Sequence, residues 1–153
     1  MSFQIIVDAD ACPVKSEIIQ AAREYQVPIT MVASYDHRLQ PAEGVQVVQV
    51  DRSDQSVDLY IANRIKPGDI LITQDFGLAA LALGKRALVL SNRGQRLHDG
   101  TIDFLLERRN EQARLRRGGK HSKGPKPLTE EDRRFFLQSL TKVLSGLQEN
   151  RTK

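Results

Sequence analysis

The chain has 153 residues, of which 40% are hydrophobic and 27% are charged, and these fractions are those of an ordinary globular domain with one core. No apolar run approaches the roughly 20 residues that a membrane-spanning helix needs, and the first residues lack the basic segment and cleavage site of a secretory signal. The single cysteine, Cys12, excludes an internal disulfide and a cysteine-based zinc cluster, so we expect a cytoplasmic protein without membrane contacts.

Short apolar runs alternate with helical patterns over the first ninety residues. The runs are rich in β-branched residues, as in buried parallel strands, and cover 3–7, 28–34, 45–50, 69–73 and 87–90. Apolar residues at helical spacing follow the proline at position 13 and recur over about 54–65 and 76–83. This alternation predicts an α/β fold: a mainly parallel central sheet of about five strands, with right-handed crossovers and helices on both faces.

The pattern changes beyond residue 91. We expect a single domain over 1–153, in which 1–91 form the α/β core and 92–153 a basic helical extension. This extension would hold a helix from 102 to about 117, a flexible loop over the glycine- and lysine-rich stretch 118–127, and a last helix with Thr129 as its N-cap. The last helix carries an apolar stripe that would pack on the sheet or on another subunit, which leaves a homo-oligomer open; its members are Phe135, Phe136, Leu140, Val143, Leu144 and Leu147.

Charge is divided unevenly along the chain. Residues 1–84 contain 6 Lys and Arg against 11 Asp and Glu, net −5, whereas residues 85–153 contain 17 against 8, net +9. An acidic part that can bind a metal, joined to a basic part that can bind phosphates, indicates a polyanionic partner such as RNA, although a basic tail can also serve solubility alone. The side chains predicted to contact the nucleic acid are Arg93, Arg114, Arg116, Arg117, Lys120, Lys123 and Lys126.

Aspartates follow two of the predicted strands, where an open α/β sheet binds its ligands. Asp8 immediately follows the first strand and Asp75 comes two residues after the fourth, so both would face one crevice if these strands are neighbours. Asp10 keeps the same side as Asp8 wherever the chain stays extended. Asp58 flanks the apolar stripe of a helix, from which it could reach the sheet edge. We therefore predict these four aspartates as metal ligands and catalytic residues.

The predicted cation is Mg²⁺ or Mn²⁺. Carboxylates gathered in one crevice repel one another and resist ionisation unless a cation is present, and these hard cations prefer oxygen ligands. Such an ion can lower the pKa of a bound water and clamp a phosphodiester. The histidines are scattered in the sequence and form no zinc pattern; they are His37, His98 and His121.

Structural roles compete with the metal role at these positions. Asp75 could cap the helix that begins at residue 76, Asp10 could compensate a helix dipole, and Asp58 could be an ordinary surface residue. Asp54 is more typical of an N-cap and Asp99 of a turn. Cys12 precedes a helix but has no evident base nearby, which favours packing over catalysis.

Three segments together resemble the YaiI/YqxD family of uncharacterised bacterial proteins over nearly the whole chain. They are VDADACPVK (7–15), SVDLYIANRIKPGDILITQDFGLAALAL (56–83) and ERRN…LRRGGKHSKGP (107–125). That family is related to the PIN-like superfamily, which includes NYN-type and other metal-dependent ribonucleases. The resemblance implies a nuclease-like fold, and it implies acids after strand one, on a middle helix and after strand four, at Asp8, Asp58 and Asp75.

The resemblance has one departure. Nuclease relatives often carry a fourth acid after the next strand, where this chain has Asn92 and Arg93, and Asp99 is the nearest acid. Asp10 would then supply the missing carboxylate, and the number of metal ions stays open.

The leading functional hypothesis is a Mg²⁺- or Mn²⁺-dependent nuclease or phosphodiesterase that acts on RNA. The first alternative is a non-catalytic RNA-binding or ribosome-associated module. The second is a phosphatase that forms an aspartyl-phosphate at Asp8, because Asp8-Ala9-Asp10 resembles the nucleophile motif of haloacid-dehalogenase-type phosphatases. That motif expects Thr or Val where this chain has Cys12.

Overall fold

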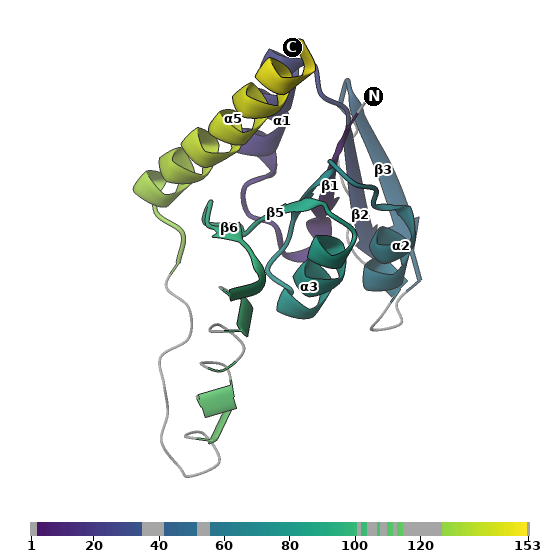
Figure 1. The fold of residues 1–153 in the computed structure, drawn as a ribbon, viewed down its shortest axis with the longest axis vertical. Coiled ribbons are helices and arrows are strands. Elements are labelled where there is room, and N and C mark those ends of the chain that lie inside the picture. The colour runs from purple at the N-terminus through teal and green to yellow at the C-terminus, as the bar shows by residue number, and fades with distance from the viewer. Residues whose placement is uncertain are drawn as a thin grey trace.

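The protein is built around one six-stranded sheet (Figure 1). The computed structural model describes residues 3–34, 42–51, 56–100, 102–103, 107, 110–111, 113–114 and 127–152. The strand order across the sheet is β3-β2-β1-β4-β5-β6. In chain order the strands are β1 (Ile5–Asp8), β2 (Ile29–Ser34), β3 (Val45–Val50), β4 (Ile70–Ile72), β5 (Leu88–Leu90) and β6 (Arg96–Leu97).

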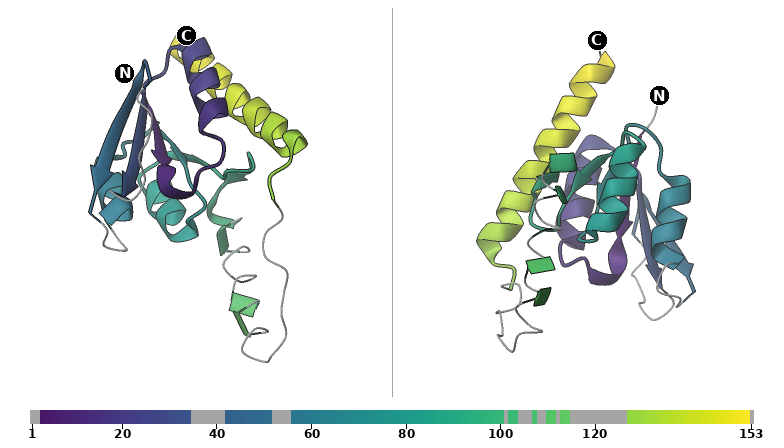
Figure 2. Two further views of the ribbon diagram at one scale, coloured as in Figure 1. Left: turned by 180° about the vertical axis from the view of Figure 1, so that it is seen from behind. Right: turned by 60° about the horizontal axis from the view of Figure 1, so that its bottom comes forward.

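Helices cover both faces of the sheet, as Figures 1 and 2 show. The 3₁₀ turn η1 (Ala9–Ala11) and helix α1 (Lys15–Tyr25) follow β1, and the long helix α5 (Glu130–Thr152) lies beside α1 on the same face. Helices α2 (Ser56–Arg64) and α3 (Phe76–Gly84) cover the opposite face. The prediction of an α/β domain with helices on both faces is confirmed.

The sheet is parallel except at one edge. Strands β1 to β5 all pair in parallel, and β1 lies between β2 and β4, with Ile5 opposite both Ile29 and Ile70. The two-residue strand β6 pairs antiparallel to β5 and was not predicted. Its position beyond residue 91 means that the sheet extends into the segment expected to be only a helical extension.

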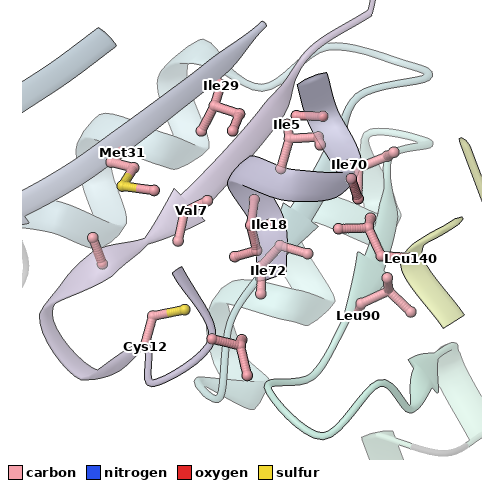
Figure 3. Packing of buried hydrophobic residues seen from close by; sticks show 14 of the residues in the cluster. Ile5, Val7, Cys12, Ile18, Ile29, Met31, Ile70, Ile72, Leu90 and Leu140 are labelled. Carbon is pink, nitrogen blue, oxygen red and sulfur yellow. The ribbon is translucent and has the colours of Figure 1, made fainter. Parts of the chain in front are cut away.

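Alternate residues of each central strand point into two separate apolar layers. Ile5 and Val7 of β1 pack under α1 and α5, whereas Ile6 between them packs under α2 and α3. Figure 3 shows the first layer, in which Ile18 of α1 and Leu140 of α5 meet the strand residues. Burial on both faces explains why these strands are continuous apolar runs rather than alternating ones.

Helix α5 buries one stripe of its surface. Phe136, Leu140 and Leu144, spaced by four residues, are fully buried against the sheet and α1. Gln148 Nε2 also donates to the Tyr25 carbonyl at the end of α1, at 2.8 Å. Of the two packing alternatives, the sheet and α1 therefore receive the stripe. Phe135 departs from its predicted place in the stripe, since 55% of it is exposed.

The start of α5 is held by a capping box. The Asp132 backbone N–H donates to Thr129 Oγ1 at 3.1 Å, and the Thr129 N–H donates to Asp132 Oδ2 at 3.0 Å. The N-cap predicted at Thr129 is confirmed. Arg133 Nη1 then donates to the Pro13 carbonyl at 2.8 Å and to Glu17 Oε1 at 3.1 Å, which ties the first turns of α5 to α1.

The turn between β5 and β6 fits closely under α5. Gly94 has φ +84°, and a Cβ at this position would lie 2.9 Å from Phe136 Cα and 3.0 Å from Ser139 Oγ. Arg93, its neighbour, forms an ion pair with Asp132 at 3.1 Å. Only glycine satisfies both the left-handed backbone and the close approach of the helix.

The C-terminal segment was predicted to contain a further helix and a loop. The described residues between 102 and 114 are all helical, in agreement with a helix in 102–117, and the predicted loop 118–127 lies outside the described residues except for its last position. In the part of the chain that the structure describes, no helix is long and apolar enough to cross a membrane.

Candidate functional site

The order of the strands places two of the predicted aspartates at one edge of the sheet. β1 and β4 are adjacent and parallel, with Val7 opposite Ile72, so the chain leaves both strands at the same end. Asp8 is the last residue of β1, and Asp75 follows β4 by three residues. The condition stated for the two aspartates, that their strands are neighbours, is met. We call the group of Asp8, Asp58 and Asp75 the carboxylate edge.

A threonine connects the two strand ends. The Thr73 hydroxyl donates to Asp8 Oδ2 at 2.9 Å and accepts from the Asp75 backbone N–H, also at 2.9 Å. Thr73 is fully buried. Both hydrogen bonds fix the direction of the hydroxyl proton, which therefore points at the Asp8 carboxylate. The sequence reasoning missed Thr73; the only signal was a polar residue at the end of the apolar run DILIT.

Asp75 also caps a helix. Its Oδ1 accepts from the Gly77 N–H at 2.9 Å and from the Leu78 N–H at 3.2 Å, at the start of α3. The capping role that competed with the metal role is thus present in the structure. It uses one carboxylate oxygen for backbone groups and leaves the ligand role of the other as a prediction.

Asp58, in the first turn of α2, interacts directly with Asp75. Burial, the charge of Asp75, a hydrogen bond to the Asp75 carboxyl and the charge of Asp8 together raise the pKa of Asp58 to about 6. A hydrogen bond between two carboxyl groups requires a proton on one of them. Asp58 and Asp75 therefore share a proton or repel each other, and the middle-helix acid lies at the edge where it was predicted.

The environment of Asp8 is similar but less exposed. Burial raises the pKa of Asp8, the hydrogen bond from Thr73 lowers it, and the charges of Asp75 and Asp10 raise it further. The net direction is upward. Asp8 is consequently within electrostatic reach of carboxylates from three other segments of the chain.

The condition on which the Asp10 prediction depended is not met. The chain does not stay extended after Asp8, because Ala9–Ala11 turns into a 3₁₀ helix. The Asp10 side chain instead reaches the end of β2, where its Oδ1 accepts from the Ser34 backbone N–H at 2.9 Å. Asp10 contributes its charge to the surroundings of Asp8, and its hydrogen bond with Ser34 fixes the loop after β1 to the sheet.

The carboxylates do not form a ready-made metal cage. Among the described residues, no three groups drawn from His, Cys, Asp and Glu are placed so that they could hold one ion as they stand. Cavities of about 430 and 410 Å³ lie elsewhere, and neither is lined by Asp8, Asp58 or Asp75. A cation at this edge would therefore rely on few carboxylates and on water or substrate oxygens, as Mg²⁺ commonly does.

The carboxylate edge is linked to the next strand end. Gln74 lies between Thr73 and Asp75, and its Oε1 accepts from the Asn92 backbone N–H at 2.8 Å, just beyond β5. Asn92 is buried, and Arg93 follows it with its Nη1 paired to Asp132. The segment after β5 is thus linked to the carboxylate edge, and it presents the amide of Asn92 and the cation of Arg93.

The remaining predicted positions are placed only in part. Arg114 is exposed, and five of the seven predicted nucleic-acid contacts lie outside the described residues: Arg116, Arg117, Lys120, Lys123 and Lys126. Asp54, His37 and His121 also lie outside them, and Asp99 is exposed. Cys12 is buried in the core beneath α1, and burial raises the pKa of its thiol to about 11, which agrees with packing rather than catalysis (Figure 3).

Comparisons with known proteins agree on one family. The chain is similar to proteins named UPF0178 from Bacillus pumilus (47% identity over 145 residues, 93% of this chain and 86% of the relative), Halalkalibacterium halodurans (46% over 144 residues, 94% and 92%) and Listeria monocytogenes (44% over 143 residues, 94% and 96%). No solved structure matches the chain. The family model described as "Uncharacterized BCR, YaiI/YqxD family" matches residues 6–146. The chain belongs to the YaiI/YqxD family.

Proposed function

We propose that this protein is a Mg²⁺- or Mn²⁺-dependent nuclease or phosphodiesterase that acts on RNA, with a fold of the PIN-like type. The observation that carries the proposal is the meeting of Asp8, Asp58 and Asp75. These residues come from a strand end, a helix start and a helix cap, yet they act on one another electrostatically at a single edge of the sheet.

The donor set suits a hard divalent cation. Among the described residues, no Lys or Arg forms an ion pair with these three carboxylates. Their mutual repulsion is therefore costly, and a bound Mg²⁺ or Mn²⁺ would relieve it. Because no three acidic groups among the described residues converge on one point, Asp8, Asp58 and the second oxygen of Asp75 would contact the ion in part through its bound waters. A site of few carboxylates matches the way Mg²⁺ keeps several waters and binds substrate phosphates.

The chain's own residues would prepare this site. The Thr73 hydroxyl holds the Asp8 carboxylate in place, and the cap at α3 holds Asp75. A bound cation would lower the pKa of a water and neutralise charge on a phosphodiester. Asp8, Asp58 and Asp75 are each partly exposed, so an RNA could reach the carboxylate edge.

One observation favours a second function, a non-catalytic RNA-binding module. Asp75 already serves as a helix cap, and no three acidic groups among the described residues are arranged around one point. In that case the carboxylates would hold one ion or none, without turnover. The phosphatase hypothesis gains no support, because Asp10, its expected second acid, is bound to Ser34 at the end of β2.

Metal binding is tested by thermal unfolding in increasing MnCl₂ or MgCl₂. An ion that binds the native state raises the Tm by mass action. The variants Asp8→Asn and Asp75→Asn remove one charge each while keeping a hydrogen-bond acceptor for Thr73 and an efficient helix cap. We expect both variants to lose the shift, and Glu43→Gln, at an exposed position just before β3 and so at the other end of the strands, to keep it. A shift of the same size in all three variants would refute the site.

Catalysis is tested with the same proteins. Labelled single-stranded and structured RNA are incubated with each protein in Mn²⁺ and in EDTA, and the products are separated by length. We expect cleavage by the unchanged protein in Mn²⁺ alone. Cleavage that persists in Asp8→Asn and Asp75→Asn contradicts the nuclease proposal, and tight RNA binding without any cleavage favours the binding module.

A further inference from the structure

A groove of about 410 Å³ runs between α5 and the strands β5 and β6, which lie at the opposite end of the strand order from β3. Its floor is apolar and includes Leu88 and Leu90 of β5 together with Val143 and Leu147 of α5. Its volume lies within the roughly 300–1,000 Å³ of typical ligand pockets. It is separate from the carboxylate edge and has no part in the chemistry proposed there.

Two cations stand on the rim of this groove. Arg96 of β6 and Lys142 of α5 both line it, and both are exposed. Among the described residues neither forms an ion pair, in contrast to Arg93 and Arg133 nearby, which do. An apolar floor with two unpaired cations above it fits a ligand that has a flat apolar part and a negative charge.

One end of the groove leads toward the carboxylate edge. Gly94 lines this end, and the exposed ring of Phe135 lies beside it, with Cδ1 3.2 Å from the place of a Gly94 Cβ. Asn92, two residues before Gly94, is hydrogen-bonded to Gln74, the neighbour of Asp75. A chain of short contacts therefore connects the groove to the residues proposed to hold the cation.

We propose that this groove binds one nucleotide of a single-stranded RNA whose neighbouring phosphodiester lies at the carboxylate edge. The base would lie on the apolar floor or against Phe135, and Arg96 and Lys142 would contact the phosphate. This inference rests on the proposed function. A second copy of the chain is a poorer occupant, because a symmetric contact would bring the same unpaired cations together.

The test is binding of a fluorescein-labelled oligouridylate of about ten nucleotides, followed by anisotropy in EDTA so that no cleavage occurs. Arg96→Gln and Lys142→Gln should each raise the Kd about fivefold or more and reduce the slope of log Kd against log salt by about 0.7. Lys66→Gln removes an exposed cation before β4, at the end of the strands opposite to the carboxylate edge, and should change the Kd little. Equal weakening by all three variants would show non-specific attraction and overturn the proposal.

A groove-filling variant tests the site without changing charge. A Cβ at Gly146, which lines the groove, meets no atom within 4 Å, so a side chain can start there without a clash. Gly146→Phe would occupy the space of the base and should weaken binding about tenfold, as should Phe135→Ala if the ring stacks on a base. Unchanged affinity in Gly146→Phe overturns the proposal. Complete displacement of the RNA by polyglutamate, an anionic polymer without bases, overturns it as well.

Failure of the two proposals can be told apart. If Asp8→Asn abolishes cleavage while the groove variants bind and cleave as the unchanged protein does, the nuclease stands and the groove proposal falls. If the groove variants lose binding and no protein cleaves RNA in Mn²⁺, the groove proposal stands and the nuclease falls.

Discussion

Two regions of the molecule arrange charge in opposite ways. One is the carboxylate edge, and the other is the seat of α5, by which we mean the face of α5 that packs on the sheet and on α1. At the edge, Asp58 meets the carboxyl group of Asp75, and burial and repulsion raise the pKa of Asp58 to about 6. At the seat of α5, by contrast, Arg133 forms an ion pair with Glu17 at 3.1 Å, and Phe136, three residues further along the helix, is fully buried. One region accumulates like charge, and the other pairs opposite charges around an apolar centre.

This difference separates residues that stabilise the fold from residues whose close approach lowers its stability. Buried apolar area and satisfied hydrogen bonds stabilise α5 on the sheet. Clustered carboxylates lower the stability of the cation-free protein, a pattern expected of a functional site. Substitutions at the seat of α5 should therefore destabilise the protein, whereas removal of a charge at the edge should stabilise it.

The largest effect is expected at Phe136. Phe136→Ala removes a fully buried ring between α5 and the sheet and should lower the free energy of unfolding by about 3–5 kcal/mol. Its neighbour Phe135 is 55% exposed, so Phe135→Ala should lower it by less than about 1 kcal/mol. Urea unfolding followed by circular dichroism measures both. Equal losses in the two variants would mean that α5 is not seated as described.

The next effect is expected at Gly94, where backbone conformation and packing act together. Gly94→Ala forces a side chain into a left-handed conformation and places its Cβ 2.9 Å from Phe136 Cα, which should cost about 2–4 kcal/mol. Gly68 has a similar φ of +88° but open space around it, so Gly68→Ala isolates the conformational cost at about 1 kcal/mol. Denaturant unfolding of the pair gives the packing contribution by difference.

Thr73 shares features of both regions, because it is fully buried and its hydroxyl contacts Asp8 and Asp75 at the carboxylate edge. Thr73→Val keeps the shape but removes the donor to Asp8 and the acceptor of the Asp75 N–H, and should cost about 1–3 kcal/mol. Thr73→Ser retains the hydroxyl and should lose less. A Thr73→Val protein that is as stable as Thr73→Ser would show that the two hydrogen bonds contribute nothing.

The sequence carried enough information for the sheet and for the position of two acids. Apolar runs of β-branched residues predicted five of the six strands, and the two-residue strand β6 was too short to leave a periodic signal. Asp8 and Asp75 follow from topology alone, because residues at the carboxyl ends of neighbouring parallel strands must lie at one edge.

Side-chain direction could not be read in the same way. The prediction for Asp10 assumed an extended chain, but η1 turns its side chain toward Ser34. Thr73 had no motif to mark it, since its role depends on two partners 65 and 2 residues away in the chain. Phe135 and Phe136 are adjacent and equally apolar, and Phe136 is the one four residues before Leu140, in register with the buried stripe of α5.

The smallest effect, and the one of opposite sign, is expected at Asp58. The pKa of this carboxyl is about 6 in the folded protein, against about 3.9 in an unfolded chain. The folded state therefore binds more protons than the unfolded state between these values, and the free energy of unfolding falls as the pH rises through this window. Asp58→Asn mimics the neutral acid at every pH and should escape this loss.

Urea unfolding in EDTA at pH 4, 5, 6, 7 and 8 measures this difference. Asp58→Asn and the unchanged protein should be of similar stability near pH 4, and the variant should be more stable by about 1 kcal/mol at pH 7, after allowance for screening by solvent. Glu43→Gln removes an exposed charge just before β3, at the opposite end of the strands from the carboxylate edge, and should leave the pH dependence unchanged. Should Asp58→Asn instead be less stable at pH 7, Asp58 would be a stabilising residue, and the contrast between the carboxylate edge and the seat of α5 would disappear.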